Sequence, residues 1–131
     1  MKRNLLVGTA LSLTLIGGTA SLLAHHSAAS AYDTEKKVTF KGTVTKLDWK
    51  NPHVFYFIDV TDSAGKVTNW AIEASTPNQL YRAGWRKDDV KTGDTVTLTD
   101  TSPARNGSPK ASGGTLTLAS GRKVFSGSPE Q

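Results

Sequence analysis

Three histidines, His25, His26 and His53, are the side chains best suited to bind a metal ion in this chain of 131 residues. The sequence holds no cysteine and only one methionine, so imidazole nitrogens are the main soft ligands available. If a leader is removed after Ala24, His25 gains a free α-amine beside its imidazole and can chelate through both. His26 or His53 would add a third nitrogen, and a planar or T-shaped set of nitrogens suits Cu(II) best.

The chain is long enough to bring these histidines together. Lys36, immediately before the first predicted strand, follows His25 by eleven residues, a segment that can span ~36 Å at ~3.3 Å per residue. In the alternative interpretation, His25 and His26 are a solvated polar tail and His53 is a turn residue that binds nothing. Two adjacent histidines near a cleavage site are a weak pattern on their own.

Residues 1–24 have the three regions of a secretory signal peptide: a positive start, an apolar stretch and a small, weakly polar end. The apolar stretch, Leu5 to Ile16, is too short to cross a bilayer as a helix, which needs ~20 residues. We therefore expect a cleaved leader, no transmembrane anchor after processing, and a periplasmic or secreted location.

The cleavage position decides whether the N-terminal histidines belong to the exported protein. Three small-residue sites compete, after Ala20, Ala24 and Ala31. Cleavage after Ala24 makes His25 the first residue, whereas cleavage after Ala31 removes both His25 and His26.

The charge of the chain sets few limits on its partners. The formal net charge is +5, and without Lys2 and Arg3 of the leader 14 basic and 11 acidic residues remain. This mild excess permits contact with an anionic partner without requiring one. Export and the scattered basic residues argue against nucleic acid, and the lack of cysteine excludes disulfides and zinc–thiolate sites.

Periodicity predicts a small β domain. A hydroxyl cap and a proline at Thr76-Pro77 predict a helix at about 77–87. Strands are predicted at 37–49, 53–60, 67–74, around 96–98, and as a strand or hairpin within 115–125. Three strands, a helix and two strands are the order of the OB-fold, so we expect a five-stranded OB-like barrel with one helix between strands 3 and 4.

The apolar face of each strand gives the expected core. Gly42 lies on that face of the first strand and predicts a bend or bulge, since Leu47 and Trp49 continue on the opposite parity. The predicted core residues are Val38, Phe40, Val44, Val54, Tyr56, Ile58, Ile72, Leu80, Val96, Leu98 and Leu116.

Composition divides the chain into four parts. They are a signal peptide at 1–24, a flexible Ala/Ser-rich arm at 25–35, the barrel at 36–126 and a frayed tail at 127–131. Within the barrel, residues 101–114 are rich in Ser, Pro, Gly and Asn, which predicts a long exposed loop.

The loops that join strands 1–2 and 4–5 flank the usual binding face of an OB-fold. Here the first of them contains Asn51-Pro52-His53, and we take Asn51, Trp49 and Trp70 as further binding candidates. As a set, the aromatic residues are better explained by core packing than by stacking on bases. The carboxylates lie on separate elements, and nothing pairs two of them as acid and base.

Several short motifs together resemble a family of small exported bacterial proteins of unknown function. They are His25-His26-Ser27, Lys41-Gly42-Thr43-Val44, Asn51-Pro52-His53, Trp70-Ala71-Ile72-Glu73, Gly84-Trp85 and Gly93-Asp94. The resemblance spans roughly residues 25–125. It implies a periplasmic location and a small β-barrel, and it brings His25, His26 and His53 into one motif set, without an activity, cofactor or partner.

We therefore predict a periplasmic, non-enzymatic binding module that holds copper or a similar metal ion through His25, His26 and His53. The alternative is a metal-free module that binds a periplasmic protein or the envelope through its OB-like loop face. An enzyme with copper on its N-terminal histidine would need an open coordination position and a substrate surface, and neither is visible in the sequence.

Overall fold

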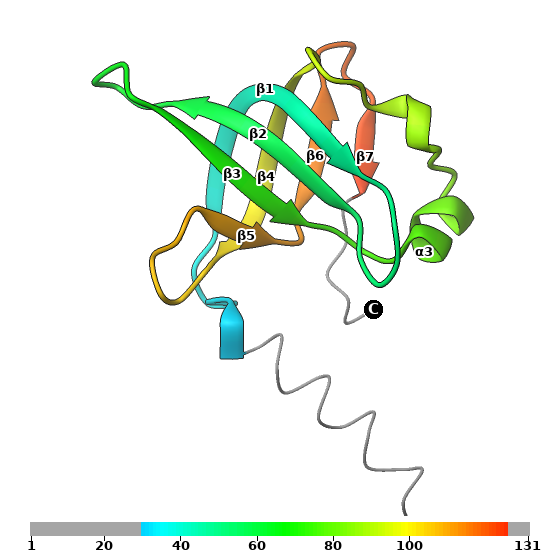
Figure 1. Cartoon of the computed structure of the whole chain (residues 1–131), viewed down its shortest axis with the longest axis horizontal. Coiled ribbons are helices and arrows are strands. Elements are labelled where there is room, and N and C mark those ends of the chain that lie inside the picture. The colour runs from blue at the N-terminus through cyan, green and yellow to red at the C-terminus, as the bar shows by residue number, and fades with distance from the viewer. Residues whose placement is uncertain (1–29, 126–131) are drawn as a thin grey trace, which may run out of the picture. The chain divides into compact units, whose positions relative to one another are not determined.

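The computed structural model describes residues 30–125, which form a closed β-barrel with helical segments on one side (Figure 1). Two helical segments separate β3 from β4: the α-helix α3 (Pro77–Arg82) and the 3-10 helix η1 (Lys87–Asp89). The strands are β1 (Val38–Asp48), β2 (Phe55–Thr61), β3 (Val67–Glu73), β4 (Thr95–Pro103), β5 (Lys110–Ser112), β6 (Thr115–Leu118) and β7 (Lys123–Phe125).

Strand pairing closes the barrel in the order β1-β2-β3-β5-β4, with β4 returning to β1. β3 and β5 run parallel, with Ile72 opposite Ala111, whereas the other pairs in the ring are antiparallel. Five strands closed in this way, with α3 between β3 and β4, confirm the predicted OB-like barrel. β6 and β7 form an additional hairpin that pairs with β4.

β1 allows the barrel to close because it pairs with β2 along one edge and with β4 along the other. Gly42 lies at the tightest approach: a Cβ there would be 2.2 Å from the carbonyl oxygen of Asp59 and 2.7 Å from Cγ2 of Ile58. The register with β2 shifts between Val44 and Lys46. The predicted irregularity of this strand is therefore confirmed, although the register shift falls shortly after Gly42.

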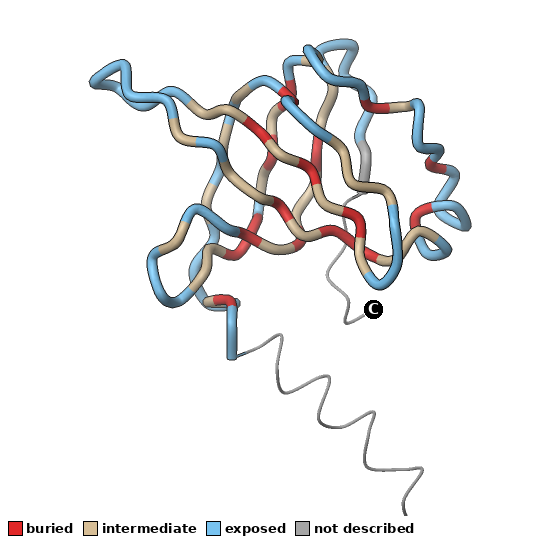
Figure 2. Tube along the Cα trace, viewed as in Figure 1, coloured by how far each residue is buried: buried red, intermediate tan, exposed pale blue. Residues whose placement is uncertain are grey.

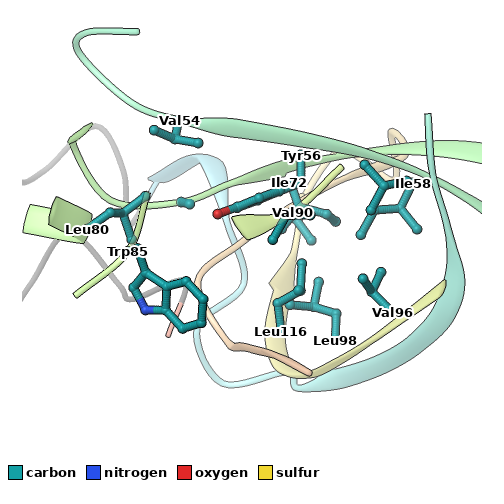
Figure 3. Close-up of a cluster of buried hydrophobic side chains, with 13 residues drawn as sticks. Val54, Tyr56, Ile58, Ile72, Leu80, Trp85, Val90, Val96, Leu98 and Leu116 are labelled. Carbon is teal, nitrogen blue, oxygen red and sulfur yellow. The ribbon is translucent and has the colours of Figure 1, made fainter. Parts of the chain in front are cut away.

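Buried residues alternate with more exposed ones along the strands of the barrel (Figure 2). All predicted core residues are buried except Val38 and Phe40, which are half-buried. Figure 3 shows the two sides of the core meeting, with Val96, Leu98 and Leu116 facing Tyr56, Ile58 and Ile72. Trp85 and Val90, from the connection between α3 and β4, also belong to this core.

The helix begins as predicted and ends earlier. Thr76 caps α3, because its hydroxyl accepts from the backbone N–H of Gln79 while the side chain of Gln79 accepts from the backbone N–H of Thr76. The predicted end near residue 87 is wrong, since α3 stops at Arg82. Gly84 has φ of +92°, which turns the chain out of the helix so that Trp85 can enter the core.

The prediction of a long exposed loop at 101–114 is wrong. β4 continues to Pro103, and the fifth strand of the barrel is β5 within this segment. Thr101, Ser102 and Ala111 are buried, and the Thr101 hydroxyl donates to the carbonyl of Ser112 at 3.1 Å. The segment 115–125, predicted as a final strand or hairpin, forms the β6–β7 hairpin, which pairs with β4 outside the five-stranded ring.

The compact unit begins at Tyr32, not at residue 36. The flexible arm predicted for 25–35 therefore does not include Tyr32, which is buried and forms a β-bridge with Ala104. Residues 25–29 and the predicted tail at 127–131 lie outside the described residues. Between residues 30 and 125, no helix is both long and apolar enough to cross a membrane.

Candidate functional site

His53 and Glu73 contact each other at the end of the β2–β3 ladder. Phe55 and Glu73 are paired residues in this ladder, and the N–H of Ala74 donates to the carbonyl of Val54 at 2.8 Å, which extends it. His53 precedes Phe55 by two residues, so its side chain lies diagonally across from Glu73 on the same face. The result is a hydrogen bond between Nδ1 of His53 and Oε1 of Glu73.

Tyr32 joins this pair from a segment distant in sequence. Its hydroxyl donates to Oε2 of Glu73 at 2.6 Å, and the residue as a whole is 9% exposed. Burial, and then the hydrogen bond to Glu73 and the charge of that carboxylate, raise the pKa of Tyr32 well above its ordinary value. The phenol therefore remains a hydrogen-bond donor at neutral pH. We call Tyr32, His53 and Glu73 the carboxylate cluster.

The carboxylate cluster fixes the tautomer of His53. An ionised carboxylate can only accept hydrogen bonds, so Nδ1 of His53 carries the hydrogen that Glu73 receives. In the neutral ring the lone pair is then on Nε2. The side chain of His53 is 25% exposed and that of Glu73 is 17% exposed. A histidine held by a carboxylate through one nitrogen presents the other nitrogen as a metal ligand in many metalloproteins.

Of the three histidines predicted as metal ligands, the structure places His53. His25 and His26 lie outside the described residues. Across residues 30–125, no three His, Cys, Asp or Glu side chains converge in a way that could hold a metal ion. A site with several histidine ligands therefore requires the N-terminal pair in addition to His53.

The other predicted binding residues are spread over the barrel. Trp49 is half-buried and packs against the core, while Asn51 is exposed in the β1–β2 connection, where the Asn51–Pro52 peptide is cis. Trp70 and Glu73 are three residues apart on β3, so their side chains point to opposite faces of the sheet. Trp70 is therefore separate from the carboxylate cluster.

Sequence analysis missed Glu73 and Tyr32 as members of the site. The turn at 62–65 contains a signal for Glu73: counting outward from this hairpin puts residue 73 opposite residue 55 and beside residue 53. Tyr32 is the only aromatic residue between positions 25 and 35. A single large apolar ring in a stretch of Ala and Ser indicates a segment that docks on the domain.

We expect the stability of the protein to fall as the pH rises above 10, in part because of Tyr32. Its pKa is raised in the folded state, so the folded protein retains a proton that the unfolded chain loses above pH ~10. The stabilisation is complete below that pH and is lost as the pH rises through the folded-state pKa. Urea unfolding at several alkaline pH values should give a shallower decline for Tyr32→Phe than for the wild type.

Tyr32→Phe should also lower stability by about 1 kcal/mol at neutral pH, through loss of the hydrogen bond to Glu73. Tyr81→Phe is the matched control, because Tyr81 is 58% exposed and a surface change of this kind has an effect within about 0.5 kcal/mol. An alkaline decline of equal slope in Tyr32→Phe and the wild type would contradict the assignment to Tyr32.

The fold and the carboxylate cluster define a small OB-like barrel protein with a carboxylate-oriented histidine at one end of the β2–β3 ladder. The chain belongs to a family of unknown function, DUF6152, whose sequence profile matches residues 13–114. Comparison with curated proteins and with solved structures found no match. The family confirms the resemblance to an uncharacterised group of proteins.

Proposed function

We propose that this protein is an exported, non-enzymatic binding module of the periplasm that holds a metal ion, copper in the first instance, through its histidines. His53 is the ligand on the barrel, and His25 and His26 are the ligands of the N-terminal segment. The observation that carries the proposal is the hydrogen bond between Nδ1 of His53 and Glu73. This hydrogen bond leaves the lone pair of Nε2 to bind the metal ion, and it orients the imidazole ring before an ion arrives.

The donor set favours copper over harder cations. The proposed ligands are imidazole nitrogens, together with the α-amine of His25 if cleavage follows Ala24. Nitrogen ligands in a tetragonal or T-shaped set suit Cu(II), whereas Mg²⁺ and Ca²⁺ prefer oxygen ligands. Glu73 supports this assignment as a partner of His53, because its two oxygens already accept from His53 and Tyr32.

Chain length allows the N-terminal histidines to reach the barrel. Tyr32, which is hydrogen-bonded to Glu73, follows His26 by six residues. Six residues can span ~20 Å when extended. His25 and His26 are therefore connected by a short segment to Tyr32, which belongs to the same carboxylate cluster as His53. An ion bound by both parts would join the N-terminal segment to the barrel and raise the melting temperature.

The test is a calorimetric titration of the naturally processed protein with Cu(II), after its intact mass has fixed the N-terminus in a periplasmic fraction. We expect one tightly bound ion per molecule near pH 7 and weaker binding at lower pH, because protons compete for the same nitrogen lone pairs. The matched control carries one additional Ala ahead of His25, which displaces the α-amine and should weaken binding.

Three outcomes would contradict the proposal. A mature N-terminus at Tyr32 would remove His25 and His26 from the exported protein. Full-length chain recovered in the membrane would exclude a cleaved leader. Absence of Cu(II) binding by a protein that starts at His25 would instead favour the metal-free interaction module.

A further inference from the structure

A cavity of about 430 Å³ opens at the end of the barrel where β1 begins and β4 ends. Its walls come from β1, β3, the end of β4 and the β4–β5 connection, which lie together at one end of the barrel in Figure 1. The mouths of β-barrels are common places for small ligands, and pockets of ~300–1,000 Å³ hold them. Glu73, His53 and Tyr32 do not line this cavity.

Two aromatic rings form the apolar part of the cavity wall. Phe40 of β1 and Trp70 of β3 stack with ring centroids 4.2 Å apart and planes tilted by 37°. Both are half-buried and pack against the core, so one side of each ring is supported by the barrel. Val38 and Pro103 extend this apolar wall. A flat apolar group is the ligand shape that such a surface favours.

The rim of the cavity is polar and carries two cations and one anion: Lys36, Arg105 and Asp33. The guanidinium of Arg105 lies 3.8 Å from the carboxylate of Asp33, and both side chains are partly exposed. The ammonium of Lys36 makes no ion pair within residues 30–125. The rim therefore has a net positive charge, which attracts an anionic group.

The rim is held in place by the backbone. The N–H of Asp33 donates to the carbonyl of Pro103 at 2.9 Å, and the N–H of Lys36 donates to the carbonyl of Asp33 at 3.1 Å. Ser108, in the same wall, has a buried hydroxyl oxygen with no hydrogen-bond partner among the described residues. A fixed rim lowers the entropy that a ligand loses on binding, and a buried polar atom without a partner favours a ligand that supplies one.

We infer that this cavity binds a small aromatic organic anion, with its ring against Trp70 and Phe40 and its anionic group between Lys36 and Arg105. The inference does not depend on the proposed metal site. A carboxylate on a flat ring matches both parts of the cavity, because cationic side chains bind a carboxylate through charge-assisted hydrogen bonds.

The experiment compares two probes of the same shape and different charge, 2-naphthoate and 2-naphthamide, in NMR titrations of the exported protein without added metal. The indole N–H of Trp70 is assigned with Trp70→Phe and followed through each titration. We expect naphthoate to shift this signal and to bind about fivefold more tightly than naphthamide, the size of effect that one partly exposed ion pair gives.

Lys36→Gln and Arg105→Gln should each weaken naphthoate binding and so reduce its advantage over naphthamide, and should leave naphthamide binding unchanged. Lys66→Gln is the matched control, because it removes the same charge from the exposed β2–β3 turn. Equal binding of the two probes would overturn the anionic part of the inference. Absence of a Trp70 shift with either probe, or equal loss of affinity in Lys66→Gln, would overturn the site itself.

Discussion

Replacement of Ile58 by alanine should destabilise the protein by about 2–5 kcal/mol, the range for removing a large buried aliphatic side chain. Ile58 is 1% exposed and lies in the middle of β2, opposite Val44 on β1 and Trp70 on β3. Its Cγ2 atom occupies the space above Gly42, where no Cβ exists. Backbone on both sides limits how far this site can collapse, so the truncation leaves a cavity.

The control is Val67→Ala on the neighbouring strand. Val67 is 56% exposed, so its truncation should change the unfolding free energy by less than about 0.5 kcal/mol. Thermal and urea unfolding of both variants would measure the difference. In a domain of this size each kcal/mol moves the melting temperature by roughly 4–8 °C, so Ile58→Ala should melt at least 8 °C below the wild type. A loss as small as that of Val67→Ala would contradict the assignment of this face of β2 to the core.

Much of the fold could be predicted because its signals are local. The alternation of Val54, Tyr56 and Ile58 shows which face of β2 is buried. Thr76 and Pro77 show where α3 begins, through a cap and a fixed φ angle. Three strands, a helix and further strands then leave few topologies, and the OB-like barrel is one of them.

β5 could not be predicted in the same way. It has three residues, and only Ala111 among them is apolar, so it carries no periodic pattern. β5 exists because the end of β4 and the end of β3 each offer it a partner: Ser102 on one side and Ile72 on the other. Tertiary pairing of this kind depends on the closed ring, which a local pattern does not contain.

In the candidate site, too, some residues have a signal in the local sequence and others are brought together only by strand pairing. His53 stands out in the sequence because histidine is rare in this chain, whereas Glu73 is one of eleven acidic residues. Only the β2–β3 register places its carboxylate next to His53. Trp70 is a further binding candidate from the sequence, but the alternation of side chains along β3 separates it from Glu73 and places it against Phe40.

Glu73→Gln should weaken Cu(II) binding by about 10- to 100-fold, the usual cost of losing the partner that orients a metal-binding histidine. A glutamine amide can still accept from Tyr32 or His53, but it lacks the charge that makes the imidazole a stronger ligand. His53→Ala should weaken binding at least as much, because it removes the proposed ligand on the barrel. If Glu73 acts only through His53, then Glu73→Gln should add almost nothing to the loss already caused by His53→Ala.

Glu35→Gln is the matched control for this comparison, because Glu35 is exposed and its replacement removes the same charge. The four proteins of the cycle and this control are titrated with Cu(II) at one pH and one ionic strength. Additive losses for Glu73→Gln and His53→Ala would mean that Glu73 affects the ion independently of His53. Unchanged affinity in His53→Ala would remove the barrel from the metal site and leave the ion to His25 and His26 alone.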